Sequence, residues 1–207
     1  MLSTSQVSYQ YPKSELISFP DINVEINSSL LIQGESGSGK TTLMHLLAGL
    51  IQPKSGSISV HNEDIHTLSP YKKDAWRGQH IGLVYQQAYF IESLSILENI
   101  MLSPYAKNMC KAIEIAERLG VSNLLSRKPY QLSTGQLQRV SICRAMMNAP
   151  QLILADEPTS ALDDKNCEEV LHLLLQEAKQ NKAVLVIVTH DTRLKSEIDN
   201  LITLEAL

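Results

Sequence analysis

The sequence has no hydrophobic run long enough to cross a membrane and only a small excess of charge. Its longest apolar stretches, such as Val184–Val188 and Leu152–Ala155, have the length of strands, whereas a membrane-spanning helix needs about 20 residues. Residues 1–10 contain no basic segment followed by an apolar one, so we expect no signal peptide. The formal net charge of −4 gives no electrostatic reason to expect nucleic acid as a partner. These absences favour a cytoplasmic chain that reaches a membrane only through a partner.

Cysteine and aromatic residues are also scarce. The three cysteines, Cys110, Cys143 and Cys167, lie far apart and form no Cys-x-x-Cys pair, so we expect neither a zinc site nor a disulfide framework. Aromatic residues make up 5% of the chain, with Trp76 as the single tryptophan. The 207 residues suffice for one large α/β domain or two small ones.

Segments with the pattern of strands alternate along the chain with segments that have helical spacing. We predict strands at Ser5–Tyr11, Asn23–Ile26, Leu30–Gln33, Ser57–Val60, Ile81–Tyr85, Leu152–Ala155, Val184–Thr189 and near Asn200–Leu204. We predict helices at Lys40–Leu50, Ala106–Leu119, Ser133–Met147 and Asp163–Lys179, and a helix-rich middle over residues 93–126. This alternation favours a parallel sheet covered on both faces, with the early strands and the helical middle as additions.

A glycine-rich loop lies between a predicted strand and a predicted helix. Its residues match the pattern G-x-x-x-x-G-K-[ST] and are Gly34, Glu35, Ser36, Gly37, Ser38, Gly39, Lys40 and Thr41. Glycines let successive backbone N–H groups turn toward phosphate oxygens, and the following helix adds its positive end. Lys40 supplies a cation for the β- and γ-phosphates, and Thr41 supplies a hydroxyl ligand for Mg²⁺. The loop therefore predicts nucleotide binding, and we include Thr42 in the predicted binding set.

Two acids and a histidine follow predicted strands. Asp156 and Glu157 end the apolar strand Leu152–Ala155, and His190 follows the strand Val184–Thr189. Ligands of open α/β sheets lie at the carboxyl ends of the strands, so all three are expected near the glycine-rich loop. We predict that Asp156 holds Mg²⁺ and that Glu157 orients the water that attacks the γ-phosphate. His190 is a candidate contact of the γ-phosphate.

The combined motifs resemble those of the ABC (ATP-binding cassette) ATPases, in order, over essentially the whole chain. The decisive segment is similar to the LSGGQ signature of that family and consists of Leu132, Ser133, Thr134, Gly135 and Gln136. A second segment resembles the D-loop and consists of Ser160, Ala161, Leu162 and Asp163. Gln86 resembles the Q-loop glutamine and His190 the switch histidine. Tyr11 lies where the family has an aromatic residue that stacks on adenine, and Tyr9 is the alternative.

The resemblance implies an α/β fold of the P-loop NTPase, RecA-like type. In this fold a parallel-sheet core carries an N-terminal antiparallel β subdomain and an inserted α-helical subdomain. It further implies a single ABC ATPase domain over residues 1–207. Residues 1–87 and 150–207 would form the core and the β subdomain, and residues 88–149 would form the helical subdomain that carries the signature.

The resemblance also implies an ATPase that works with ATP and Mg²⁺ and powers a separate integral membrane permease from the cytoplasmic face of the membrane. Two ATPase subunits, taken to be copies of one chain, would meet head to tail, with Ser133 and Gly135 of one serving the γ-phosphate bound by the other. Asp163 would join the two sites across the interface. A groove near Gln86–Leu97 would receive the permease. The implied catalytic residues are Glu157, His190, Gln86 and Lys40, and the implied metal ligands are Thr41, Gln86 and Asp156.

One residue departs from the family pattern. Thr134 occupies a signature position that is usually glycine. A β-branched residue disfavours positive φ and adds bulk near the opposing nucleotide, so we expect Thr134 to slow hydrolysis or to tune dimer affinity. Because the other signature and hydrolysis residues match, we expect activity to be retained.

The segment Leu154–Thr159 has the form L-A-D-E-P-T, which is similar to the lipoprotein-releasing and macrolide-exporter branch of the family. Members of this branch often convert ATP cycles into mechanical work. Three other readings stay open at this point: a soluble ABC ATPase of DNA repair or translation, a P-loop small-molecule kinase, and a cassette that binds ATP without turnover. The first usually has a coiled-coil insertion or a second cassette, and a kinase has no use for residues 132–136.

Overall fold

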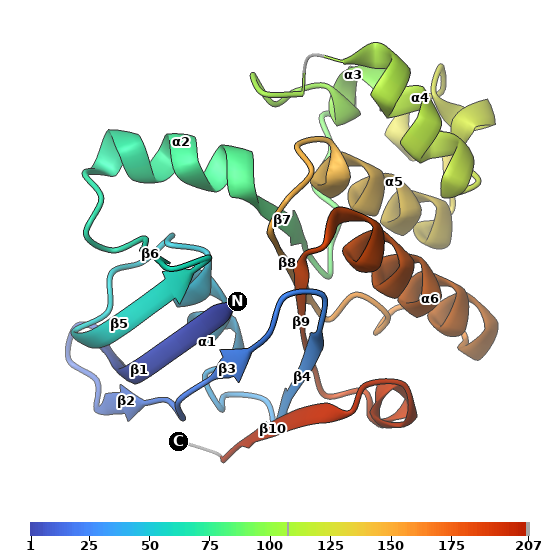
Figure 1. Ribbon diagram of the computed structural model, residues 1–207. Coiled ribbons are helices and arrows are strands. Elements are labelled where there is room, and N and C mark those ends of the chain that lie inside the picture. The colour runs from blue at the N-terminus through green and yellow to red at the C-terminus, as the bar shows by residue number, and fades with distance from the viewer. Residues whose placement is uncertain (107, 206–207) are drawn as a thin grey trace.

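The computed structural model describes residues 1–106 and 108–205 (Figure 1). Its strands are β1 (Leu2–Gln10), β2 (Leu16–Ser18), β3 (Asn23–Val24), β4 (Ser29–Gly34), β5 (Ser55–Val60), β6 (Glu63–Asp64), β7 (Ile81–Val84), β8 (Leu152–Asp156), β9 (Val184–Thr189) and β10 (Asn200–Leu204). Its α-helices are α1 (Lys40–Leu47), α2 (Pro70–His80), α3 (Ile96–Ile100), α4 (Met109–Arg118), α5 (Thr134–Met146) and α6 (Asp164–Asn181). Short 3₁₀ turns are η1 (Ser122–Leu124), η2 (Pro129–Gln131) and η3 (Thr192–Ser196).

The central layer is a parallel sheet with the strand order β10-β4-β9-β8-β7. Successive residues of β9 point to opposite faces, so Val184, Val186 and Val188 pack in one core cluster and Leu185 and Ile187 in the other. Both faces of the strand are therefore buried, which explains its unbroken apolar sequence. The predicted parallel sheet, covered on both faces, is confirmed.

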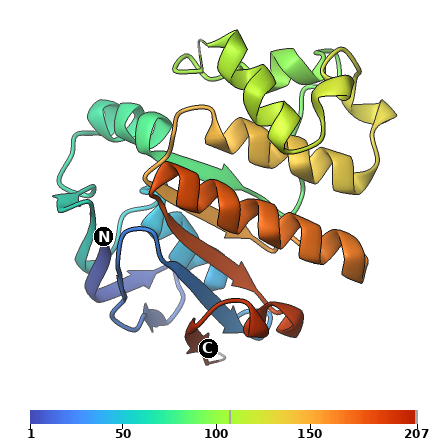
Figure 2. The same ribbon diagram turned by 45° about the vertical axis from the view of Figure 1, so that its right-hand side comes forward.

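Different layers cover the two faces of this sheet. On one face α1 packs together with an antiparallel sheet in which β1 pairs with β2, β3 and β5, and β5 pairs with β6. The opposite face is covered by α5 and α6. Figure 2 shows α6 (orange) lying across the parallel sheet, with α3 and α4 beyond α5 on the side away from the sheet. This arrangement matches the expected core with an antiparallel β addition and a helical addition.

The element bounds depart from the sequence prediction in instructive places. Helix α2 is missing from the prediction because it is polar, with Trp76 as its buried residue. The helix predicted at Ala106–Leu119 begins later, at Met109, where the side chain of Asn108 caps it by accepting a hydrogen bond from the Lys111 N–H. Residue 107, inside the predicted range, lies outside the described residues. Strand β1 begins at Leu2 instead of Ser5, with a register shift between Ser5 and Ser8.

The strand ends bring the predicted site residues to one edge of the parallel sheet. The glycine-rich loop leaves β4, Gln86 follows β7, Asp156 ends β8 and His190 follows β9. Because the sheet is parallel, all these carboxyl ends lie on the same side. Among the described residues, the helices are all too short or too polar to span a membrane.

Candidate functional site

The glycine-rich loop joins β4 to α1 in a conformation that needs its glycines. Gly37 and Gly39 both have a φ of 87°, in the left-handed region that side chains disfavour. The Lys40 ammonium folds back over the loop and donates hydrogen bonds to the carbonyl oxygens of Gly34 and Glu35, each at 2.7 Å. The loop thus presents the N-terminal end of α1 to a cavity, as expected for a phosphate cradle.

This cavity has a volume of about 910 Å³. It brings together residues from both ends of the chain, namely Tyr11, Glu35, Ser36, Gly37, Gly39, Lys40, Thr41, Thr42, Gln86, Asp156, Glu157 and His190. Of the predicted loop residues, Gly34 ends β4 and Ser38 is buried beneath the loop, so these two support the loop instead of lining the cavity. One cavity therefore unites the predicted nucleotide, metal and hydrolysis residues.

Asp156 lies beside Thr41 at the end of β8. The Thr41 hydroxyl donates to Asp156 Oδ2 at 3.4 Å. Burial, followed by repulsion from Glu157, raises the pKa of the Asp156 carboxyl. A cation bound between the Asp156 carboxylate and the Thr41 hydroxyl would relieve that repulsion, and oxygen ligands of this kind are those that Mg²⁺ prefers. The two side chains therefore fit the metal predicted from the sequence.

Glu157 is held firmly at the turn after β8. Its backbone has a φ of 47°, and its N–H donates to the Val188 carbonyl at 2.8 Å. Its carboxylate accepts a hydrogen bond from the Thr189 hydroxyl at 2.7 Å and one from the His190 N–H at 3.1 Å. The His190 ring Nδ1 also lies 2.7 Å from this carboxylate. Sequence reasoning selected Glu157 and His190 and missed Thr189, because a threonine at the end of an apolar strand gives no distinctive signal.

Gln86 is tied to the D-loop segment in the same chain. Its side-chain amide donates to the Ser160 hydroxyl at 3.1 Å, and that hydroxyl donates to the Glu157 carbonyl oxygen at 3.1 Å. Ser160 thus joins the residue after β7 to the turn that carries Glu157. The sequence predicted Gln86 and Ser160 separately but gave no sign of this contact.

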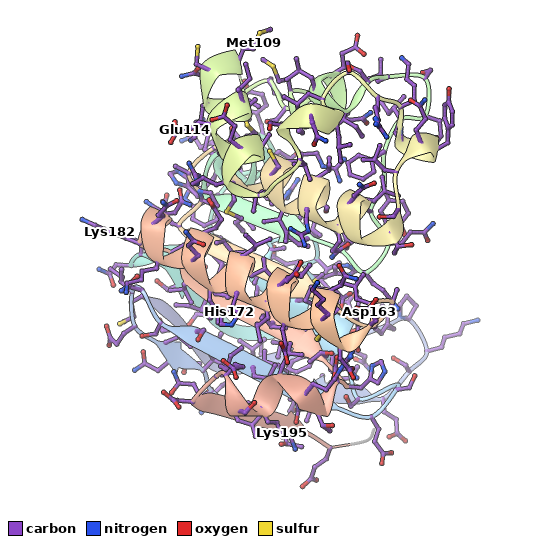
Figure 3. The ribbon with its side chains drawn as sticks, turned by 90° about the vertical axis from the view of Figure 1, so that its right-hand side faces the viewer. Met109, Glu114, Asp163, His172, Lys182 and Lys195 are labelled. Carbon is purple, nitrogen blue, oxygen red and sulfur yellow. The ribbon has the colours of Figure 1, made fainter. Side chains whose placement is uncertain are left out.

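The signature segment and the rest of the D-loop line a second cavity of about 490 Å³. Its lining includes Ser133, Thr134, Gly135, Gln136, Ala161, Leu162 and Asp163. Within the described part of the chain, it shares no lining residue with the first cavity. Leu132 precedes the cavity and packs against the core. Figure 3 shows Asp163 at the N-terminal end of α6, which runs to Lys182 at its other end.

Ser133 and Asp163 each cap a helix. Ser133 Oγ accepts from the Gln136 N–H while the Gln136 side chain accepts from the Ser133 N–H, so the two form a capping box at the start of α5. Asp163 accepts from the Asn166 backbone N–H at 2.9 Å, and this bond lowers the pKa of its carboxyl. The concern that Thr134 needs a positive φ is wrong, because Thr134 is the first residue of α5 and has helical backbone geometry.

The two tyrosines that were candidates for adenine stacking have different surroundings in the structure. Tyr11 lines the first cavity, is 43% exposed and forms a 2.9 Å hydrogen bond with the Thr42 hydroxyl. Tyr9 packs partly buried against the core and meets Tyr11 edge-on, with ring centroids 4.8 Å apart. The cavity also has a wall that the sequence did not predict, formed by Ser14, Glu15, Leu16 and Ile17. The position of this wall depends on the pairing of β2 with β1, a tertiary contact.

Comparison with known proteins identifies the family of the chain. The family model described as ABC transporter matches residues 20–160. The ATP-binding protein LolD of the lipoprotein-releasing system of Hydrogenovibrio crunogenus is 36% identical over 193 residues, covering 90% of this chain and 84% of the relative. The macrolide export ATP-binding/permease protein MacB of Rhodopirellula baltica is 38% identical over 192 residues, covering 89% of this chain and 28% of the relative.

A solved structure has the fold described above. The dimeric post-hydrolysis state of the ATP-binding cassette MJ0796, bound to ADP and phosphate, aligns with a TM-score of 0.87 and 31% identity, covering all of this chain and 96% of that one. The sequence similarity to LolD and MacB matches the branch expected from the segment Leu154–Thr159. The chain therefore belongs to the ABC transporter family, as an ATP-binding subunit that hydrolyses ATP.

Proposed function

We propose that two copies of this ATPase subunit meet head to tail and enclose each ATP between the glycine-rich loop of one copy and the signature of the other. The observation that carries the proposal is the separation of the two cavities within one chain. Glu157 lies in the first cavity, whereas the N-terminal end of α5, which favours negative charge, lies in the second. A second copy brings the two halves together, and the similar cassette MJ0796 is dimeric in its state bound to ADP and phosphate.

In this arrangement the glycine-rich loop and Lys40 bind the β- and γ-phosphates. Thr41, Asp156 and Gln86 would hold Mg²⁺, and the Gln86 amide now donates to the Ser160 hydroxyl. The metal would neutralise charge on the phosphate oxygens. Tyr11 stacks on the adenine at the far end of the cavity, and Thr42 holds the Tyr11 hydroxyl. Across the interface, Ser133 and Gly135 contact the γ-phosphate and Asp163 contacts the partner copy.

Hydrolysis depends on Glu157 and His190. Glu157 is positioned beside the phosphate cradle and orients the attacking water, acting as general base. The His190 side chain is 66% exposed and therefore free to turn from Glu157 toward the γ-phosphate. Binding of ATP closes the dimer and loss of phosphate reopens it, so the pair is a ligand-biased two-state switch.

A separate integral membrane permease uses this switch, and the chain acts at the cytoplasmic face of the membrane. The similar protein LolD is named as the ATP-binding protein of a lipoprotein-releasing system, and MacB combines ATP-binding and permease functions. Within the groove expected near Gln86–Leu97, Tyr89 and Ile91 are exposed, whereas Phe90 packs against the core and under Arg144. The neighbouring segment adds exposed Leu102 and Tyr105.

A permease bound at residues 86–97 would lie beside the helical subdomain, residues 88–149, which we propose moves relative to residues 1–87 and 150–207. Figure 1 shows α3, α4 and α5 grouped together at one end of the molecule. Movement of this group transmits dimer closure to the permease as mechanical work. The resemblance to LolD and MacB supports this kind of output.

Size-exclusion chromatography with and without Mg-ATP, together with phosphate release on the same samples, tests the proposal. Glu157→Gln should abolish phosphate release and shift to a dimer only with ATP. Glu25→Gln is the matched control, because Glu25 is exposed outside both cavities, and it should behave as the unchanged chain does. If Glu157→Gln hydrolyses ATP as fast as this control and stays monomeric, Glu157 is not the general base and ATP does not drive dimerisation.

A further inference from the structure

The two oxygens of the Glu157 carboxylate have different partners. Oε2 accepts a 2.7 Å hydrogen bond from the Thr189 hydroxyl. Oε1 lies 2.7 Å from the His190 ring Nδ1 and accepts from the His190 N–H at 3.1 Å. One side of the carboxylate therefore depends on Thr189, and the other depends on His190.

Thr189 is buried, whereas the His190 side chain is exposed. Thr189 is the last residue of β9 and is fully buried, at 0% exposure. The His190 side chain is 66% exposed. A nucleotide can thus draw the imidazole away from Oε1, while the bond between Thr189 and Oε2 stays in place.

A second contact sets the direction of the Thr189 hydroxyl proton. Thr189 Oγ1 accepts a 3.0 Å hydrogen bond from the Asp191 N–H, so its own proton points to Glu157 Oε2. Asp191 is anchored in turn, because its side chain accepts from the Thr159 hydroxyl at 3.1 Å and from the Arg193 guanidinium at 2.7 Å. The hydroxyl is therefore a preset donor, held by the turn that carries His190.

We propose that Thr189 is a positioning residue for ATP hydrolysis, which aims Glu157 by holding Oε2 so that Oε1 faces the attacking water once the His190 imidazole has turned away. This inference rests on the proposed role of Glu157 as general base. In the reaction the water oxygen forms the new bond to the γ-phosphorus and the bond to the ADP leaving oxygen breaks. One water proton passes to Oε1. Without Thr189 the carboxylate can rotate, and the fraction of correctly aimed complexes falls.

The test compares Thr189→Val with Thr189→Ser. Valine keeps the branched shape in the core strand and removes the hydroxyl, whereas serine keeps the hydroxyl and removes a methyl group. Phosphate release with Mg-ATP gives kcat and KM, and binding of a fluorescent ATP analogue gives nucleotide affinity. Thr189→Val should lower kcat about 10- to 100-fold, the effect of one hydrogen bond to a charged group, with KM and nucleotide affinity unchanged within about twofold.

Thr189→Ser should restore kcat to within about threefold of the unchanged chain, since its hydroxyl can make the same bond. Equal loss of kcat in the valine and serine variants would overturn the proposal, because the threonine would then act through its packing. A normal kcat in Thr189→Val would overturn it as well. Glu157→Gln in the same assay separates the two hypotheses. If Glu157→Gln loses phosphate release while Thr189→Val does not, the positioning role of Thr189 is wrong and the role of Glu157 stands. If both variants are fully active, the role of Glu157 as general base is wrong too.

Discussion

Arg118 of α4 and Glu177 of α6 form a bidentate ion pair between the helical addition and a helix that covers the core sheet. Arg118 Nε donates to Glu177 Oε1 at 2.9 Å, and Nη2 donates to Oε2 at 3.0 Å. The Glu177 side chain is 2% exposed. The hydrogen bonds to Glu177 raise the pKa of the Arg118 guanidinium. This pair links α4 to α6 at a place where an unpaired carboxylate would be shielded from water.

Arg118→Met should therefore lower the free energy of unfolding by about 3 kcal/mol, because it leaves the Glu177 carboxylate buried without its partner. Urea denaturation measures the change. Arg77→Met is the matched control, because Arg77 pairs with Asp74, whose side chain is 69% exposed, and should cost less than about 1 kcal/mol. Equal losses in the two variants would show that the burial of Glu177 adds nothing to the pair.

The pKa of the Asp191 carboxyl, and with it the loss of stability in acid, should depend on Arg193. Hydrogen bonds from the Arg193 guanidinium lower the pKa of the Asp191 carboxyl to about 2. Because the folded pKa lies below the ordinary value of about 3.9, this carboxylate stabilises the fold above that pH and loses its effect as the pH falls toward 2. Arg193→Gln should raise the pKa of Asp191 and move the acid-induced loss of stability to higher pH.

Carbon-13 NMR of the Asp191 carboxyl carbon follows this titration directly. Lys195→Gln serves as the control, because it removes a positive charge from the same turn, η3, without touching Asp191. A pKa of Asp191 that stays near 2 in Arg193→Gln would mean that the backbone N–H of residue 193 and the Thr159 hydroxyl hold the carboxylate without the guanidinium.

The cysteines should differ sharply in their reactivity. Cys110 is exposed, whereas Cys143 and Cys167 are buried, and burial raises the pKa of the Cys143 thiol to about 12. Because the thiolate is the reactive form, Cys110 should react fast with a disulfide reagent at pH 8, and the buried thiols should react only after unfolding. The rate at which the reagent releases its chromophore measures how fast the thiols react. Cys110→Ser should remove the fast phase, and a fast phase that persists would contradict the burial of the other two.

The sequence predicted the chemistry of the site better than its supporting contacts. Lys40, Asp156, Glu157 and His190 follow from motifs at the carboxyl ends of strands, and the structure brings all of them to one cavity. The hydrogen bond from Thr189 to Glu157 is a tertiary contact between β9 and the turn after β8, which no local pattern encodes. Motifs indicate candidate site residues, whereas the side chains that contact those residues depend on the register between strands.

The strands and helices also differ in how well the sequence predicts them. The bounds of β9 and β10 agree with the prediction, since an apolar run or a change of composition marks both ends. Helix α2 gives no such signal, because Trp76 is its buried residue and its indole N–H donates to Glu63 at 2.7 Å. A helix with one buried aromatic residue has no apolar periodicity, so a search for such periodicity does not find it.

The two tyrosines near the cavity provide a final prediction. Tyr11→Ala should weaken ATP binding about tenfold, because base–aromatic stacking contributes about 1–3 kcal/mol. Tyr11→Phe keeps the ring and removes the hydrogen bond to Thr42, so its affinity should stay near that of the unchanged chain. Tyr9→Ala should lower stability and spare affinity, because Tyr9 packs against the core. Fluorescence titration with an ATP analogue measures binding. If Tyr9→Ala loses affinity and Tyr11→Ala does not, Tyr9 is the stacking residue, and the wall from Ser14 to Ile17 must move when the nucleotide binds.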